Sequence, residues 1–193
     1  MAIITAPAFA LKQVDWTLDR PAQINRSAYT GTRTVVANPW HGIWRAKVTL
    51  RTEQGEAAIR TLRGFFASLK GQINTFQLTA VETAQHGSGT STAAAIGAQG
   101  ATTITLNNTP PLTAGMLATV TLPSGNLQMV MLTAAIAGSV ITFEPPLREA
   151  IAIGALVDTA NPTCLVALAS SAFGWGVSNW RRYDIGFDVE EAF

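Results

Sequence analysis

The sequence predicts a mainly β protein: a β-sandwich or split-barrel host domain with one α-helix, interrupted by a small all-β barrel or sandwich insertion domain. Three observations predict this class. Short stretches of alternating apolar and polar residues recur along the 193-residue chain, as is typical of strands with one buried face. A single segment has the apolar spacing of an amphipathic helix. A long segment without charged residues divides the charged remainder into two parts.

The host domain is assigned to residues 1–82 and 161–193, where charge density is ordinary. Residues 44–50 alternate apolar and polar side chains, which predicts a strand with one buried side. Further strands are expected at residues 16–18, 34–36, 75–78, 165–169 and 183–189. Residues 54–69 predict the one helix, because apolar side chains recur there every three or four positions, at Ile59, Leu62, Phe66 and Leu69. Gly71 is expected to end this helix in a left-handed conformation.

Residues 83–160 are predicted to form the inserted domain, since residues 83–143 contain no Asp, Glu, Lys or Arg. Insertions succeed in exposed loops whose ends lie close together. Turns are expected at residues 123–126 and 137–139. Alternation predicts short strands with core positions at Ile104, Leu106, Ala118, Val120, Leu122, Leu127, Met129, Met131, Ile141 and Phe143. Several short strands at close spacing predict a small all-β barrel or sandwich.

The charge of the chain argues against nucleic acid as a partner. The formal net charge is +1, from 13 Lys and Arg against 12 Asp and Glu, which provides no field to hold a polyanion. Charged residues make up 13% of the chain, about half of the ~25% usual in globular proteins. Either partners cover much of the surface, or the surface is unusually neutral.

No segment is expected to enter a membrane, and the single cysteine is expected to be inert. The first ten residues lack the basic start and apolar core of a signal peptide. The most apolar stretches are far shorter than the ~20 residues of a membrane span, so we expect a soluble protein without membrane insertion. Cys164 lies in an apolar run and is expected to be a buried thiol without a chemical role.

No constellation of residues predicts catalysis or metal binding, so the sequence predicts neither an enzyme nor a cofactor. The two histidines, His41 and His86, have no second histidine three or four positions away, as a local zinc site would require. Ser170 and Ser171 lie outside any Gly-x-Ser-x-Gly motif. The Gly-Ser-Gly at residues 87–89 is followed by no lysine, so it is not a phosphate loop.

Large planar side chains stand beside arginines at several positions. Trp, Tyr and Arg dominate the energetics of protein interfaces, and scarce charge favours a surface covered by partners. We predict interface anchors at Trp40, Trp44, Arg148, Arg181 and Arg182. The competing interpretation is that each tryptophan fills the host core.

The order of several motifs resembles a family of bacteriophage proteins. The motifs are WTL at residues 16–18, NPW at 38–40, WRAKVTL at 44–50 and FFASLKGQINTF at 65–76. In this order they resemble the distal tail (Dit-like) protein at the tail tip of phages with long, non-contractile tails. The neutral segment, with TTITL at residues 102–106 and PPLR at 145–148, resembles the inserted domain of such prophage proteins. The resemblance covers most of the chain and rests on packing and turn patterns.

The resemblance implies a virion structural protein, made in the cytoplasm of the bacterial host and located at the phage tail tip. Its host domain would form a ring, usually of six copies, that joins the tail tube protein to tip, hub or baseplate proteins. The second domain would project outward, and no catalytic residues are implied. In some relatives the second domain is C-terminal, whereas here it interrupts the host. A ring also pairs exposed strand edges between copies, which removes the aggregation hazard of open edges.

Three alternatives stay open at the level of the sequence. The chain could form another tail ring, such as a tube or terminator ring. It could be a carbohydrate-binding tail module, although residues 83–160 contain one aromatic residue, Phe143, and sugar sites generally use flat aromatic faces. A wall-degrading hydrolase is disfavoured because acid, base and metal constellations are missing. The ring number, the neighbouring proteins and the orientation of the inserted domain are not set by the sequence.

Overall fold

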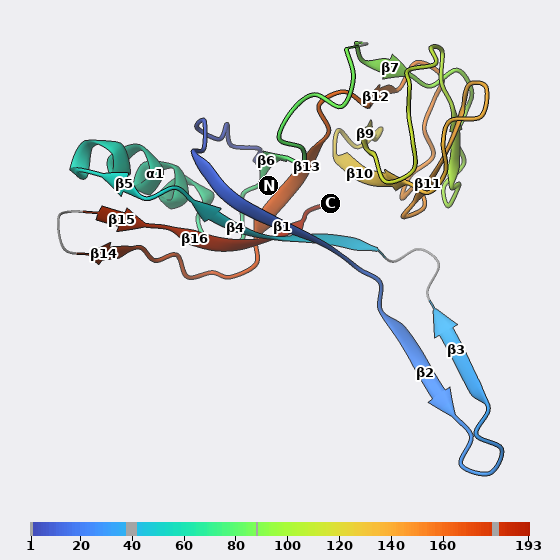
Figure 1. Ribbon diagram of the computed structural model, residues 1–193, viewed down its shortest axis with the longest axis horizontal. Helices are drawn as coiled ribbons and strands as arrows, with labels where there is room; N and C mark the ends of the chain where they lie inside the picture. The colour runs from blue at the N-terminus through green and yellow to red at the C-terminus, as the bar shows by residue number, and fades with distance from the viewer. Residues whose placement is uncertain (1, 38–41, 88, 179–181) are drawn as a thin grey trace. The chain divides into compact units, whose positions relative to one another are not determined.

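The structure is a computed structural model that describes residues 2–37, 42–87, 89–178 and 182–193 (Figure 1). Strands account for 44% of the chain and helix for 7%, which confirms the mainly β class. Two units are distinguished by their internal contacts. The host unit comprises Met1–Thr17, Trp44–Glu82 and Thr163–Phe193, and the second unit comprises Leu18–Ile43 and Thr83–Pro162. The segment Leu18–Ile43, which the sequence assigned to the host, therefore groups with the second unit.

A five-stranded sheet forms the centre of the host unit. Its order is β1 (Leu11–Asp19), β4 (Ile43–Leu50), β16 (Gly186–Glu191), β13 (Thr163–Leu168) and β6 (Phe76–Thr79). Strand β13 pairs antiparallel with both of its neighbours, and β16 pairs antiparallel with β4. Alternate side chains of β4 are buried, as the sequence predicts. A three-stranded sheet of β14 (Gly176–Ser178), β15 (Arg182–Asp184) and β5 (Glu53–Gln54) completes the strands of this unit.

Helix α1 (Glu56–Leu69) covers one face of the central sheet through aromatic contacts. The ring of Phe65 lies 5.3 Å from that of Phe76, and the ring of Phe66 lies 4.9 Å from that of Phe187. The predicted apolar stripe is confirmed, since all four of its members are buried. The helix begins two residues later than predicted, because residues 53 and 54 form strand β5 and Gly55 turns the chain at φ 95°.

The C-terminus of α1 differs from the prediction by one residue. Lys70 itself adopts the left-handed conformation, at φ 51° and ψ 47°, and its backbone N–H donates to the Ala67 carbonyl. Gly71 follows with φ 68°. A non-glycine residue in this conformation is uncommon. Lys70 and Gly71 together end the helix with two consecutive left-handed residues, after which the chain leads to β6.

The second unit contains a small closed barrel. Its six strands follow the order β7 (Ser91–Thr92), β12 (Leu156–Asp158), β9 (Leu117–Thr121), β10 (Leu127–Leu132), β11 (Val140–Glu144) and β8 (Thr103–Thr105). All described pairings in it are antiparallel. An antiparallel bridge between Ala93 and Leu106 joins the ends of β7 and β8. The sheet therefore closes on itself, and its two edges satisfy each other.

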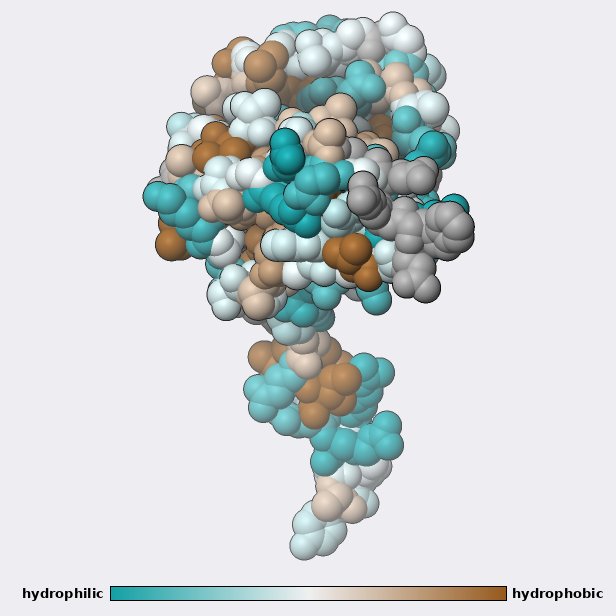
Figure 2. Space-filling view, turned by 90° about the vertical axis from the view of Figure 1, so that its left-hand side faces the viewer, coloured by the Kyte–Doolittle hydropathy of each residue, from teal (hydrophilic) through white to brown (hydrophobic). Residues whose placement is uncertain are grey.

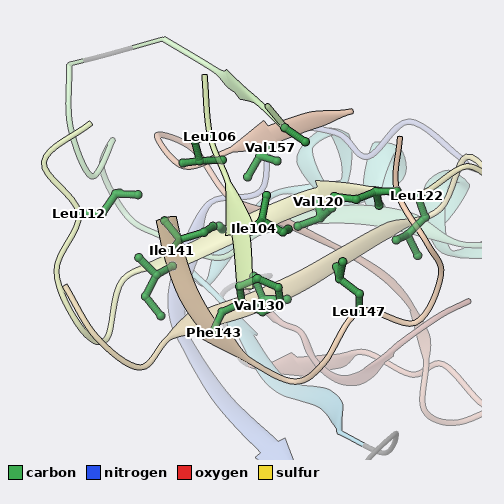
Figure 3. Close-up of a cluster of buried hydrophobic side chains, with 14 residues drawn as sticks. Ile104, Leu106, Leu112, Val120, Leu122, Val130, Ile141, Phe143, Leu147 and Val157 are labelled. Carbon is green, nitrogen blue, oxygen red and sulfur yellow. The ribbon is translucent and has the colours of Figure 1, made fainter. Parts of the chain in front are cut away.

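Apolar side chains fill the interior of this barrel (Figure 3). Fourteen buried residues make the cluster: Ala93, Ile104, Leu106, Leu112, Ala118, Val120, Leu122, Val130, Leu132, Ile141, Phe143, Leu147, Ile151 and Val157. Seven of the ten predicted core positions belong to it. In β10, Val130 and Leu132 face this core. The prediction is wrong for Leu127 and Met131, which are partly exposed, whereas Met129 is fully buried as predicted but lies outside this cluster.

A buried glutamine explains the error in β10. Gln128 is fully buried opposite Val120, a core residue of β9. Its amide donates to the Pro146 carbonyl at 2.8 Å and accepts from the Arg148 backbone N–H at 2.9 Å. A buried amide that satisfies two backbone groups avoids the cost of desolvation, so Gln128 occupies a core position although alternation places it on the polar face of the strand.

Candidate self-association surface

Strands β2 (Ala22–Arg26) and β3 (Arg33–Ala37) form a hairpin that pairs with no other described strand. The register places Ile24 opposite Val35 and Arg26 opposite Arg33. The hairpin turn is closed by the Ser27 N–H, which donates to the Thr32 carbonyl at 3.0 Å. Gly31 supplies the positive φ of 68° that this turn requires. The sequence predicts β3 but not β2.

Every residue at positions 20–36 is exposed, which is unusual for strands with large aliphatic side chains. Ile24 is 54% exposed, Val35 48% and Val36 56%. In Figure 2 the hairpin shows brown apolar side chains beside teal hydrophilic ones, above its paler tip. A two-stranded hairpin without a covered face is at best marginally stable in water. Both faces of this hairpin are therefore available to a partner.

The two faces of the hairpin differ in chemistry. Opposed residues share a face, so one face carries Ile24 and Val35 and, toward the turn, Arg26 and Arg33. Like charges directly opposite each other destabilise a strand pair. No Asp or Glu occurs at residues 20–36. The face therefore combines an aliphatic pair with an arginine pair that lacks a carboxylate within the hairpin.

The host sheet has one covered edge and one open edge. Beside β6, the N-terminal segment forms a parallel bridge between Ile3 and Thr75. The Ile4 N–H donates to the Thr75 carbonyl at 2.7 Å. At the other end of the sheet, β1 has β4 as its one neighbour among the described strands. An open edge of this kind is a template for an added strand.

A groove of about 280 Å³ in the host unit is bounded by β1 and by residues 79–82. Its lining mixes apolar and polar side chains: Leu11, Lys12, Gln13, Val14, Trp16, Thr79, Ala80, Val81 and Glu82. The Nε1 atom of Trp16 is buried, and none of the described groups accepts its hydrogen. A buried donor without an acceptor is costly, so an acceptor for Trp16 would stabilise this part of the host unit.

The predicted anchor Trp44 is a core residue. It is 4% exposed, and its ring meets that of Trp16 edge-on at 6.3 Å. Its backbone N–H donates to the buried Oε2 of Glu191 at 3.2 Å. The prediction of Trp44 as an exposed interface anchor is therefore wrong, because an inward position on β4 places the indole in the host core.

The remaining predicted anchors fall in different units or outside the described residues. Arg148 is half-buried, and its guanidinium donates to the Gly42 carbonyl within the second unit. Arg182 is exposed on the short strand β15 of the host unit. Trp40 and Arg181 lie outside the described residues. Sequence reasoning missed strand β2 and so the hairpin, although three β-branched aliphatic residues, Ile24, Val35 and Val36, and the turn residue Gly31 were available as its signal.

A cation–aromatic cluster fastens α1 to the three-stranded sheet of the host unit. The guanidinium of Arg63 lies 4.4 Å from the centre of the Trp175 ring and 5.4 Å from that of Tyr183. Glu56 accepts hydrogen bonds from the Tyr183 hydroxyl at 2.7 Å and from Arg63 at 2.6 Å. The Tyr183 hydrogen bond, followed by the charge of Arg63, lowers the pKa of Glu56. The same hydrogen bond, together with burial, raises the pKa of Tyr183.

The other side chains that the sequence offered as reactive groups are hydrogen-bonded, buried or outside the described residues. A ring nitrogen of His86 lies 2.9 Å from the hydroxyl of Thr159, and Cys164 is buried. His41 lies outside the described residues. Across the described ranges, no three His, Cys, Asp or Glu side chains gather as a metal ion would require. In the same ranges, no helix has the length and apolarity to span a membrane.

Comparison with known protein families and with characterised proteins finds no match for this sequence.

Proposed function

We propose that the protein is a virion structural protein that acts by associating with copies of itself into a ring at the distal end of a phage tail. The ring would link the tail tube to tip or baseplate proteins, as the motif resemblance implies. The observation that carries the self-association is the hairpin, whose residues 20–36 are all exposed although they include three large aliphatic side chains. A surface of this kind favours burial against another protein.

The hairpin has the size that a specific contact needs. Standard interfaces contain about 20–30 residues on each side and bury roughly 800 Å² per partner. The 17 consecutive exposed residues at positions 20–36 supply most of such a surface from one element. Scarce charge supports the same proposal, because 13% charged residues leave little repulsion between copies.

A carbohydrate-binding role has less support than self-association. Phe143, the one aromatic residue of the inserted segment, is fully buried in the barrel core. The barrel therefore offers no aromatic face on which a sugar ring could stack.

The mass of the purified chain in solution, measured by light scattering, tests the proposal. We expect ring-sized species whose population rises with concentration and whose closed shape is visible by negative-stain microscopy. Val35→Asp should shift the mass toward one chain, because it places a charge on the aliphatic face. Thr34→Asp, on the opposite face of the same strand, is the matched control and should shift it less. A single-chain mass at all concentrations contradicts the proposal.

A further inference from the structure

We propose that the β2–β3 hairpin of one copy docks along strand β1 of a second copy, with Ile24 and Val35 in the groove bounded by β1 and residues 79–82. This inference rests on the proposed self-association and names the two surfaces that meet. The occupant of the groove is a second copy of this chain, because the chain itself presents both an uncovered hairpin and an open edge.

The backbone of β1 is suited to accept an added strand. It is an edge strand of nine residues with β4 as its one described neighbour. Each residue of a strand adds ~3.3 Å of length, so β1 is long enough to pair with the whole of either five-residue strand of the hairpin. Adding the hairpin would extend the five-stranded sheet and pair the free N–H and C=O groups of both partners.

The groove beside β1 suits the aliphatic face of the hairpin. Leu11, Val14 and Val81 give it apolar walls, and its volume is about 280 Å³. At ~30 Å³ per water molecule, this is room for several methyl and methylene groups. Ile24 and Val35 are opposed on one face, so both could enter the groove together and lose contact with water.

The orphan donor of Trp16 is an independent observation at the same groove. Trp16 lines the groove, and its buried Nε1 has no acceptor among the described groups. An added strand brings backbone carbonyls along β1, and one of them would accept this hydrogen once the indole turns toward the groove. The docked strand therefore supplies an acceptor that the described groups of the single chain do not provide.

Charge complementarity also favours this pairing. Glu82 lines the groove, and Asp15 is exposed on β1, while Lys12 is the one cation of the lining. The hairpin offers Arg26 and Arg33 side by side without an acidic residue. Carboxylates near β1 would offset the repulsion between these two arginines.

The two surfaces make the contact heterologous. The donor hairpin begins at Ala22 and the acceptor strand ends at Asp19, so every copy carries one of each. A contact between different surfaces leads from copy to copy and closes into a ring when the rotation permits. This is the symmetry that the proposed function requires.

Cross-linking between two populations of the chain tests the docking. One population carries Gln13→Cys on β1, and the other carries Asn25→Cys or Thr34→Cys on the hairpin and a mass tag. Both have Cys164→Ala, which removes the buried native thiol. A short bismaleimide should join tagged to untagged chains at several times the yield obtained when Arg60→Cys, on the exposed side of α1, replaces Gln13→Cys.

The outcomes separate this inference from the proposed function. If multimers form but the cysteine on β1 does not cross-link to the hairpin cysteine, or cross-links no better than Arg60→Cys does, the docking is overturned and self-association stands. A single-chain mass without cross-links overturns both. Trp16→Phe gives a second readout, since it removes the N–H and part of a ring that packs against Trp44. It should weaken assembly about 5-fold, equivalent to ~1 kcal/mol, at temperatures where the single chain stays folded.

Discussion

The hairpin and the barrel of the second unit are built from similar short strands and differ in what covers them. In the barrel, Ile104, Val120 and Ile141 are at most 3% exposed and face a common interior. In the hairpin, Ile24 and Val35 are about half exposed and face each other across a single pair of strands. The barrel satisfies both of its edges internally, whereas the hairpin leaves two edges open. The difference shows that alternating aliphatic residues predict a strand but do not predict whether the same chain covers it.

Loss of the barrel core should have the largest effect on stability. Phe143→Ala removes a fully buried ring from the interior shown in Figure 3. We expect a loss of about 3–5 kcal/mol in the free energy of unfolding, measured by denaturant titration. Val36→Ala, at an exposed hairpin position, is the control and should change it by less than about 0.5 kcal/mol. Equal losses would show that the hairpin has an intramolecular core after all.

A smaller loss of stability is expected at the bridge between Gly97 and Ile151, two residues outside the named strands of the barrel. A methyl group at Gly97 would lie 2.8 Å from Ile151 Cγ1 and 2.9 Å from Leu147 Cδ1. Because both side chains are buried, Gly97→Ala should cost about 1–3 kcal/mol by overpacking. Gly89→Ala meets no atom within 4 Å and should leave the denaturation midpoint unchanged. An unchanged midpoint for Gly97→Ala would contradict the close packing at this bridge.

Removing one charge of the Arg26–Arg33 pair should stabilise the hairpin slightly and weaken assembly. Arg33→Thr removes the like charge opposite Arg26, which we expect to stabilise the isolated hairpin by about 0.2–1 kcal/mol. Hydrogen exchange of the β2 and β3 amides in the single chain measures this change, and light scattering measures assembly. Tighter assembly of Arg33→Thr would exclude carboxylates as the partners of these arginines.

The smallest effect concerns pH and the host unit. The lowered pKa of Glu56 contributes stability that is present above its ordinary value of 4.5 and is lost as pH falls through the folded pKa. The raised pKa of Tyr183 contributes below its ordinary value of 10.0 and is lost as pH rises through the folded pKa.

Tyr183→Phe should therefore reduce the loss of stability at both ends of the pH range. Melting temperatures between pH 3 and pH 11 measure it. Tyr29→Phe, at a fully exposed tyrosine of the hairpin turn, should leave the pH profile unchanged. Superimposable profiles for Tyr183→Phe and the unmodified chain would exclude a contribution from the Glu56–Tyr183 hydrogen bond.

The sequence predicted elements whose pattern is decided locally. The 3.6-residue spacing of Ile59, Leu62, Phe66 and Leu69 identifies α1 because one face of a helix is buried wherever the helix packs. The mainly β class and the barrel follow from strand alternation in the same way. The face of β10 could not be predicted from the local pattern. The buried amide of Gln128 is hydrogen-bonded to backbone groups that lie 18 and 20 residues further along the chain.

The candidate surface was harder to predict than the fold. Trp44 is an apolar position on an alternating strand, and alternation does not say whether tryptophan faces a core or a partner. Strand β2 has the sequence AQINR, with one large apolar residue, and forms because β3 lies beside it. A candidate interface is recognised because its apolar residues are exposed. That exposure is known only from the folded chain.

The junction of the barrel with the rest of the chain explains how such an insertion is tolerated. Gln85 at the entry donates its backbone N–H to the Ala160 carbonyl at the exit, 2.9 Å away. Its side-chain amide also donates to the Leu117 and Thr159 carbonyls, each at 2.7 Å. Since the barrel starts and finishes at two hydrogen-bonded residues, deleting the residues between Gln85 and Ala160 would leave two chain ends that already lie side by side.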